Sequence, residues 1–116
     1  MKTYQELYRI ILLILYYLPE FKRRIFFQAV LIQEAFWDLA DKFPDELSGL
    51  NFEIVVEKPF SKELDKIIKD IYSNSTFLSI EQIGRYQINR QNFDPNRVIV
   101  DLSQDKIKRM AKAIHL

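Results

Sequence analysis

The sequence predicts one domain of mixed helix and sheet, of the α+β class, that spans residues 1–116. A length of 116 residues is typical of a single domain, and 48 % apolar with 28 % charged residues is the balance of a globular protein. The first part of the chain is rich in helix formers with apolar residues at helical spacing. The second part contains short β-branched and aromatic stretches, which are typical of strands.

The N-terminal half predicts two helices. Residues 3–18 contain strong helix formers and no Gly, and Pro19 ends the segment because proline disfavours helix at the residue before it. Residues 21–43 form the second expected helix, which has one polar stripe, a wide apolar face and Pro44 as its stop. Gly49 follows in a loop, where it is available for a backbone conformation with positive φ.

The C-terminal half predicts strands and two further helices. The expected elements are a strand over 52–56, a helix over 61–71, hairpin strands over 77–83 and 85–89, a short strand over 97–100 and a final helix after residue 103. Ser61 and Ser103 are good N-caps for the two helices, and Gly84 lies at the expected turn. The pattern of residues 79–82 is also compatible with a short helical turn.

The composition argues against catalysis. The chain has no cysteine, which excludes disulfides, thiolate metal sites and thiol nucleophiles. Its one histidine, His115, is next to the C-terminus, so we expect neither a His-based triad nor a multi-His metal site. Gly49 and Gly84 are the only glycines, too few for a phosphate-binding loop. We therefore expect no enzyme, no catalytic residue, no metal site and no cofactor.

The apolar run over residues 10–18 is about half the roughly 20 residues needed to span a bilayer. Glu6 and Arg9, without a small-residue cleavage site, argue against a signal peptide. We expect a cytoplasmic protein with no membrane partner, because the absence of cysteine also suits a reducing compartment.

The net charge of +1 is too small to indicate nucleic-acid binding by itself, but the charge is unevenly distributed. Residues 1–57 carry 6 basic and 9 acidic side chains, a net −3, and residues 58–116 carry 11 and 7, a net +4. Lys22, Arg23 and Arg24 form a basic cluster near the start of the second helix. They are either a contact to phosphate or to an acidic partner, or a solvated face paired with a neighbouring carboxylate.

The segment Lys58-Pro59-Phe60-Ser61-Lys62-Glu63-Leu64 resembles the Gly-Pro-Tyr-Ser-x-Glu-Leu segment of small prokaryotic winged-helix (winged helix-turn-helix) proteins. Four residues match the motif: Pro59, Ser61, Glu63 and Leu64. The resemblance implies a winged-helix-like α+β fold, with a helical N-terminal half, a β-hairpin wing and a C-terminal helix. Such relatives include DNA-binding regulators, antitoxin-like proteins and adaptor subunits, and the fold does not choose among them.

The resemblance also implies which residues contact DNA. The helix over 61–71 would enter the major groove, and the hairpin would contact the backbone or the minor groove. The expected DNA contacts are Lys62, Lys66, Lys69, Arg85, Tyr86, Arg90 and Arg97. Glu63, Asp65 and Asp70 share the outward positions of the helix, and phosphates repel carboxylates.

Two hypotheses for function follow. The first is a winged-helix transcription regulator that binds double-stranded DNA as a homodimer. The second is a protein-interaction module, such as an adaptor or antitoxin-like subunit, that binds a protein partner and no DNA. Both favour a dimer interface on the first helix at Ile10, Leu13, Ile14 and Tyr17, because a helix that is apolar all round suits either a core or a shared interface.

Overall fold

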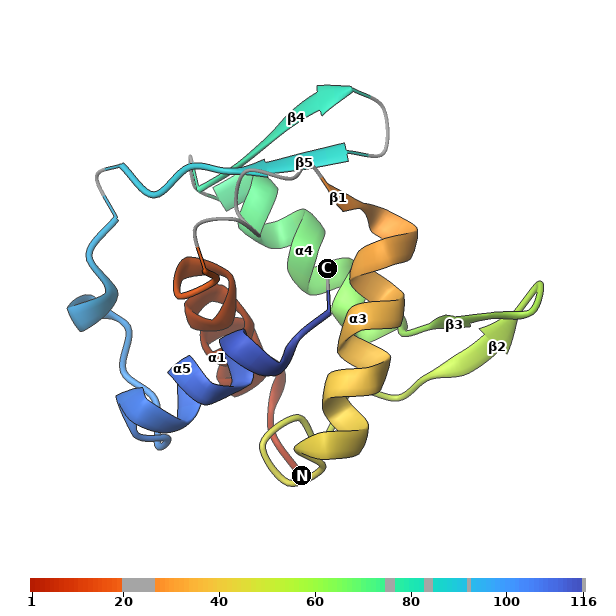
Figure 1. Cartoon of the computed structure of the whole chain (residues 1–116), viewed down its shortest axis with the longest axis horizontal. Helices are drawn as coiled ribbons and strands as arrows, with labels where there is room; N and C mark the ends of the chain where they lie inside the picture. Colours follow the sequence, from red (N-terminus) through yellow and green to blue (C-terminus); the bar gives the residue numbers. More distant parts are fainter. Residues whose placement is uncertain (20–26, 75–76, 83–84, 92, 116) are drawn as a thin grey trace.

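The computed structural model describes residues 1–19, 27–74, 77–82, 85–91 and 93–115. It is an α+β structure that contains an antiparallel hairpin (Figure 1). Its elements are α1 (Tyr4–Tyr16), β1 (Phe27–Gln28), α3 (Ala29–Lys42), β2 (Glu53–Val55), β3 (Lys58–Phe60), α4 (Lys62–Asn74), β4 (Leu78–Gln82), β5 (Arg85–Ile88), the 3-10 helix η1 (Pro95–Arg97) and α5 (Gln104–Ala113). The α+β class predicted from the sequence is therefore confirmed.

Helix α1 is the centre of the core, as its apolar sequence predicts. Thr3 caps its N-terminus in a capping box with Glu6, in which each residue accepts a hydrogen bond from the other's backbone N–H. Helices α4 and α5 both pack against α1. As a result the helix is buried nearly all round, and its buried residues are Leu7, Ile10, Ile11, Leu12, Leu13, Ile14 and Leu15.

The expected helix over 21–43 is wrong at residues 27–28, which form strand β1 instead. Phe27 pairs with Tyr86 and Gln28 with Arg85 of β5. Residues 20–26 lie outside the described residues. Pairing with β5 overrides the local helix propensity of residues 27–28. The local sequence pattern gives no sign of a partner so far along the chain. The three-stranded sheet has the order β1-β5-β4.

Strands β4 and β5 confirm the expected hairpin and exclude the alternative helical turn. Their antiparallel pairing runs from Leu78 with Ile88 to Gln82 with Arg85, with an irregularity after Ile80. The strand expected over 97–100 is wrong. Asp94 instead caps η1 and proline occupies its first position, which favours a helical turn.

The predicted final helix is confirmed as α5. Ser103 accepts a hydrogen bond from Lys106 N–H at its N-terminus. The expected apolar stripe is buried and consists of Ile107, Met110, Ala111 and Ile114. Gly49 also adopts the expected positive φ, of 104°, and a Cβ atom there would lie 2.7 Å from a backbone carbonyl oxygen.

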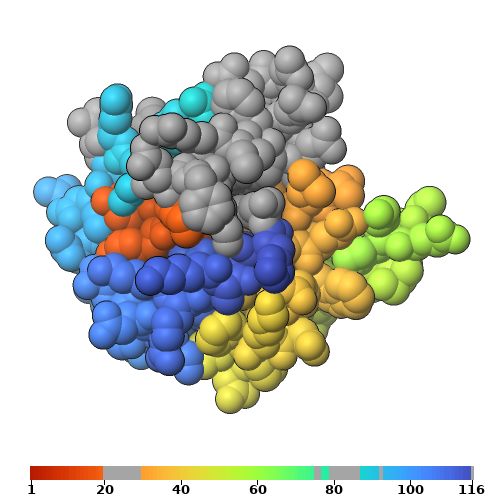
Figure 2. Space-filling model, in the orientation of Figure 1, coloured from red at the N-terminus to blue at the C-terminus, as the bar shows by residue number. Residues whose placement is uncertain are grey.

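Between α3 and α4 the chain forms a hairpin that we call the arm, comprising β2, β3 and the turn between them (residues 53–60). Ile54 pairs with Pro59 and Val55 with Lys58. The expected strand over 52–56 is thus confirmed as β2, but β3 was missed because Pro59 indicates an edge strand or a loop. The arm projects from the body of the molecule beside α3 (Figures 1 and 2).

Across the ranges that the structure describes, no helix combines the length and the apolar character that crossing a membrane requires.

Candidate interaction surfaces

Three predicted DNA-contacting lysines lie on the exposed face of α4. Lys62, Lys66 and Lys69 follow the i, i+4, i+7 spacing of one helical stripe, and all three are exposed. The opposite face of α4 is buried against the core through Leu64, Ile67, Ile68 and Ile71. The hydrophobic periodicity of this segment therefore places the lysines correctly at the surface.

Carboxylates on the same helix balance two of these lysines. Lys66 Nζ lies 2.9 Å from an Asp70 carboxylate oxygen, and Lys69 Nζ lies 2.8 Å from one of Asp65. Among the described residues, no ion pair involves Lys62. Within the described part of the chain, the α4 face thus presents Lys62 without an ion pair and two lysines that are already paired.

Asp70 is held in its charged form by a contact from α1. The Tyr4 hydroxyl donates a hydrogen bond to its carboxylate, and this bond, followed by that from Lys66, lowers the pKa of Asp70. Burial, with the hydrogen bond and charge of Asp70, raises the pKa of Tyr4. Lys66 Nζ also lies 5.0 Å from the centre of the Tyr4 ring. These contacts anchor the middle of α4 to the start of α1.

Two of the arginines predicted to contact DNA, Arg90 and Arg97, have different surroundings. Arg90 is half-buried, and its guanidinium lies 4.1 Å from the centre of the Tyr16 ring. Its Nε is buried without a hydrogen-bond partner among the described residues. Arg97 belongs to η1, where it is exposed and 3.7 Å from Asp94. Arg90 therefore packs against the end of α1 instead of facing outward with the α4 lysines.

The remaining predicted contacts cannot be placed in the same way. Arg85 and Tyr86 belong to β5, next to β1, but their side chains lie outside the described part of the chain. The basic cluster of Lys22, Arg23 and Arg24 lies outside the described residues altogether.

The residues expected at a dimer interface on α1 lie within the chain's own structure. Ile10, Leu13 and Ile14 are buried, and Tyr17 is half-buried. Since α4 and α5 pack against this helix, a second copy cannot reach Ile10 and Ile14 without opening the core, and Leu13 is reached only through a pocket. A dimer interface formed by these residues does not fit the structure. The apolar surface of α1 instead forms the core of the chain itself.

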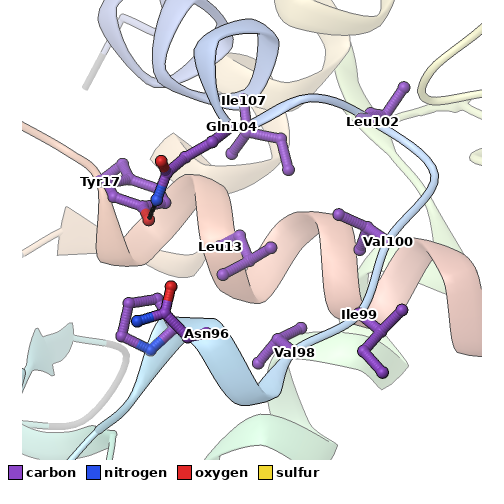
Figure 3. Close-up of a pocket in the computed structure, with 10 residues that line it drawn as sticks. Leu13, Tyr17, Asn96, Val98, Ile99, Val100, Leu102, Gln104 and Ile107 are labelled. Atoms are coloured by element: carbon purple, nitrogen blue, oxygen red, sulfur yellow. Dashed lines mark hydrogen bonds between the residues drawn. The ribbon is translucent and has the colours of Figure 1, made fainter.

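A pocket of about 310 Å³ lies between α1, the segment from η1 to residue 102, and the start of α5 (Figure 3). Tyr17, Asn96 and Gln104 place polar groups at one end, and the Gln104 amide donates a hydrogen bond to the Tyr17 hydroxyl. The rest of the lining is aliphatic and includes Leu13, Val98, Ile99, Val100, Leu102 and Ile107. This lining suits a small apolar group with one hydrogen-bonding end.

The arm carries a surface that the sequence analysis missed. Ile54 is 64 % exposed, Val55 47 % and Val56 89 %. On α3, Val30 and Trp37 are also about half exposed, two helical turns apart on one face. Three consecutive apolar residues in the strand expected over 52–56 were the available signal, because apolar and polar residues usually alternate in a half-buried strand.

The turn of the arm has an unusual backbone. Val56 has φ of 49° and Glu57 has φ of 65°, so both central residues are left-handed. Such hairpin turns favour Asn-Gly, since the left-handed region is poor for side chains and worst for β-branched ones. Val56 thus has a backbone conformation that is sterically unfavourable for valine, and its exposed side chain adds nothing to the core. A strained residue that does not stabilise the fold suggests a functional role.

The base of the arm is firmly attached to the body. The Ser61 N–H donates to Gln33 Oε1 at 2.8 Å, and Gln33 Nε2 donates to the Ser61 carbonyl at 3.1 Å, both in buried surroundings. Lys58 Nζ lies 3.0 Å from a Glu34 carboxylate oxygen. A pocket of about 350 Å³ lies in the corner between arm, α3 and α4, where Val30, Val55, Val56, Pro59 and Phe60 are its apolar lining.

Neither a metal cluster nor a known relative assigns a function to these surfaces. Among the described residues, no group of three or more His, Asp or Glu side chains is placed to hold a metal ion. The chain matches no protein-family model, and neither a curated protein nor a solved structure matches it.

Proposed function

We propose that the chain is a winged-helix DNA-binding protein in which α4 enters the major groove and the β4–β5 hairpin is the wing. The observation that carries this proposal is the strand order β1-β5-β4. Strand β1 precedes α3 and pairs with β5 of the hairpin that follows α4. Strands of one sheet therefore flank α3 and α4 in the sequence. Two helices followed by a hairpin are the layout of a helix-turn-helix with a wing, and in this chain residues 43–61, which include the arm, stand in place of the short turn.

The chemistry of α4 supports contact with phosphate. Lys62 is available without breaking an ion pair among the described residues, and the exposed pairs of Lys66 and Lys69 are weak enough to exchange a carboxylate for a phosphate. Three neutralised phosphates correspond to a slope of about −2.7 in a plot of log affinity against log salt concentration. The acidic residues on the same face oppose binding, so we expect modest affinity that falls with added salt.

Fluorescence anisotropy of a labelled duplex tests this proposal, from about 50 mM to about 200 mM salt. The double variant Lys66→Ala/Lys69→Ala should bind roughly tenfold or more weakly, with a salt slope smaller in size by about two. The matched control Arg109→Ala/Lys112→Ala removes the same charge from exposed positions of α5 and should bind like the wild type. Wild-type protein that fails to bind at low salt, or equal losses in both double variants, would rule out α4 as the DNA-binding element.

The arm favours a second candidate function, a protein-interaction module. Its exposed Ile54, Val55 and Val56 are apolar, and large apolar patches on a protein surface mark protein contacts. Glu53 and Glu57 on the same arm would repel DNA. The two functions use different surfaces, so the α4 variants above test DNA binding while leaving the arm intact.

A further inference from the structure

The pocket between α1, the segment from η1 to residue 102 and the start of α5 has the size and the lining of a small-molecule site. Its volume of about 310 Å³ lies at the lower end of the range for ligand sites, roughly 300–1,000 Å³. Figure 3 shows two unlike ends, with the polar side chains at one end and the aliphatic side chains of residues 99, 100 and 102 at the other. A ligand that fills this pocket is therefore small, with one polar head on an aliphatic body.

The aliphatic lining combines a fixed wall with an open side. Leu13 of α1 and Ile107 of α5 are 4 % and 1 % exposed, and both belong to helices that pack against each other. Ile99 lines the same pocket but is 78 % exposed. An aliphatic ligand that rests on the fixed wall would cover Ile99, and removing this apolar surface from water favours binding.

The polar end has an unused hydrogen-bond donor. The Gln104 amide donates to the Tyr17 hydroxyl, whose own proton has no acceptor within the described part of the chain. The Asn96 side chain likewise makes no hydrogen bond there, because only its backbone N–H is bonded, to Asp94. A ligand head at this end must therefore accept the Tyr17 proton, as a carbonyl oxygen does, and the Asn96 amide can bond to the rest of the head.

The surroundings of the polar end favour a neutral head. None of the described lining residues carries a charge. Charges of both signs lie nearby: Lys108 Nζ is 5.3 Å from the centre of the Tyr17 ring, whereas Asp101 and Asp105 adjoin lining residues in the sequence. The ion pair at η1 adds no net charge. A charged head would thus lose water without gaining a dedicated counter-charge, which a neutral head avoids.

From these features we infer that the pocket binds a small, neutral aliphatic molecule with a carbonyl head, of the amide or ester class. The carbonyl oxygen accepts the Tyr17 proton, and the aliphatic body lies on Leu13 and Val98. For a ligand of about ten non-hydrogen atoms, we expect a dissociation constant on the order of 0.1–1 mM. This site is independent of the proposed DNA binding, because no residue of α4 lines it.

A titration with octanamide to about 3 mM, followed by methyl NMR, tests the site because this range brackets the expected dissociation constant. The methyl signals of Leu13, Val98 and Val100 should shift along one saturating curve. Those of Val55 and Val56 should not shift, although these arm residues are exposed and apolar. Pocket signals that stay unchanged, or that shift no more than those of the arm, would overturn the inference.

Two ligands of the same chain length test the neutral head. Octanoate carries a negative head and octylammonium a positive one, so each should bind at least about tenfold more weakly than octanamide. Equal or tighter binding of either charged ligand would contradict the assignment of a neutral head.

A matched pair of variants tests the hydrogen bond at the polar end. Tyr17→Phe keeps the ring but removes the hydroxyl, and it should raise the dissociation constant for octanamide roughly three- to tenfold. Tyr8→Phe is the control, because Tyr8 is a half-buried tyrosine of the same helix outside the pocket, and it should bind like the wild type. Unchanged methyl signals of the arm verify that each variant is folded. Equal affinities of the two variants would exclude Tyr17 as the donor to the head.

Discussion

Replacing the two turn residues of the arm, Val56→Asn with Glu57→Gly, should stabilise the folded chain. Both residues have left-handed backbone angles, 49° and 65° in φ, and this region costs an ordinary residue roughly 1–2 kcal/mol. Asn-Gly is the preferred pair for such a turn. Glycine offsets about 0.5–1 kcal/mol of this gain, because it raises the conformational entropy of the unfolded chain. Because Val56 is 89 % exposed, its removal costs almost no buried area. The net expectation is a gain of about 1–2 kcal/mol in the free energy of unfolding.

For a domain of this size, that gain corresponds to a rise of about 4–8 °C in the melting midpoint. The assay is thermal unfolding followed by circular dichroism at about 1 µM protein. Val56→Thr is the control, because threonine is polar but still β-branched and should leave the midpoint nearly unchanged. A double variant whose midpoint stays the same or falls would refute the strained turn.

Two further predictions concern contacts within the body. Gln33→Ala removes both partners of the buried Ser61 backbone groups and should lower the free energy of unfolding by about 2–4 kcal/mol in urea denaturation; a loss below about 1 kcal/mol would mean that water replaces the amide. Lys106 donates a hydrogen bond to Glu46 at 2.6 Å and so lowers the pKa of this carboxyl below 4.5, its unfolded value. The resulting stabilisation is present above about pH 4.5 and is lost as the pH falls through the folded pKa. Wild type should therefore be more stable than Glu46→Gln near pH 7 and lose this advantage near pH 3, whereas a constant difference would argue against the ion pair.

The sequence predicted those elements whose signals are local. Apolar periodicity and capping residues predicted α1, α4 and α5, and a β-branched run predicted β2. Strand β1 was missed because its only support is pairing with β5, a contact across almost 60 residues that no local pattern encodes. Strand β3 was missed because Pro59 is a poor strand residue everywhere except at an edge or a bulge.

The candidate site divides in the same way. Helical spacing correctly placed Lys62, Lys66 and Lys69 on one exposed stripe, and the spacing of four residues from Lys66 to Asp70 already allowed their pairing. Arg90 stacks on the ring of Tyr16, more than 70 positions away in the sequence. The partial burial of Arg90 therefore could not be predicted from local sequence patterns. Similarly, burial of the dimer residues on α1 depends on α4 and α5, which lie far along the sequence.

The paired hydrogen bonds between Gln33 and Ser61 hold the arm, α3 and the start of α4 together at one point. One side chain of α3 fixes the single residue that separates the last strand of the arm from the first turn of α4. Gln33 also lines the corner pocket, so a group bound in the pocket lies next to these hydrogen bonds. A partner that displaced the arm would shift the same peptide that orients α4, and where such a shift changes binding at α4, linkage makes the effect on the partner of the arm equal in size.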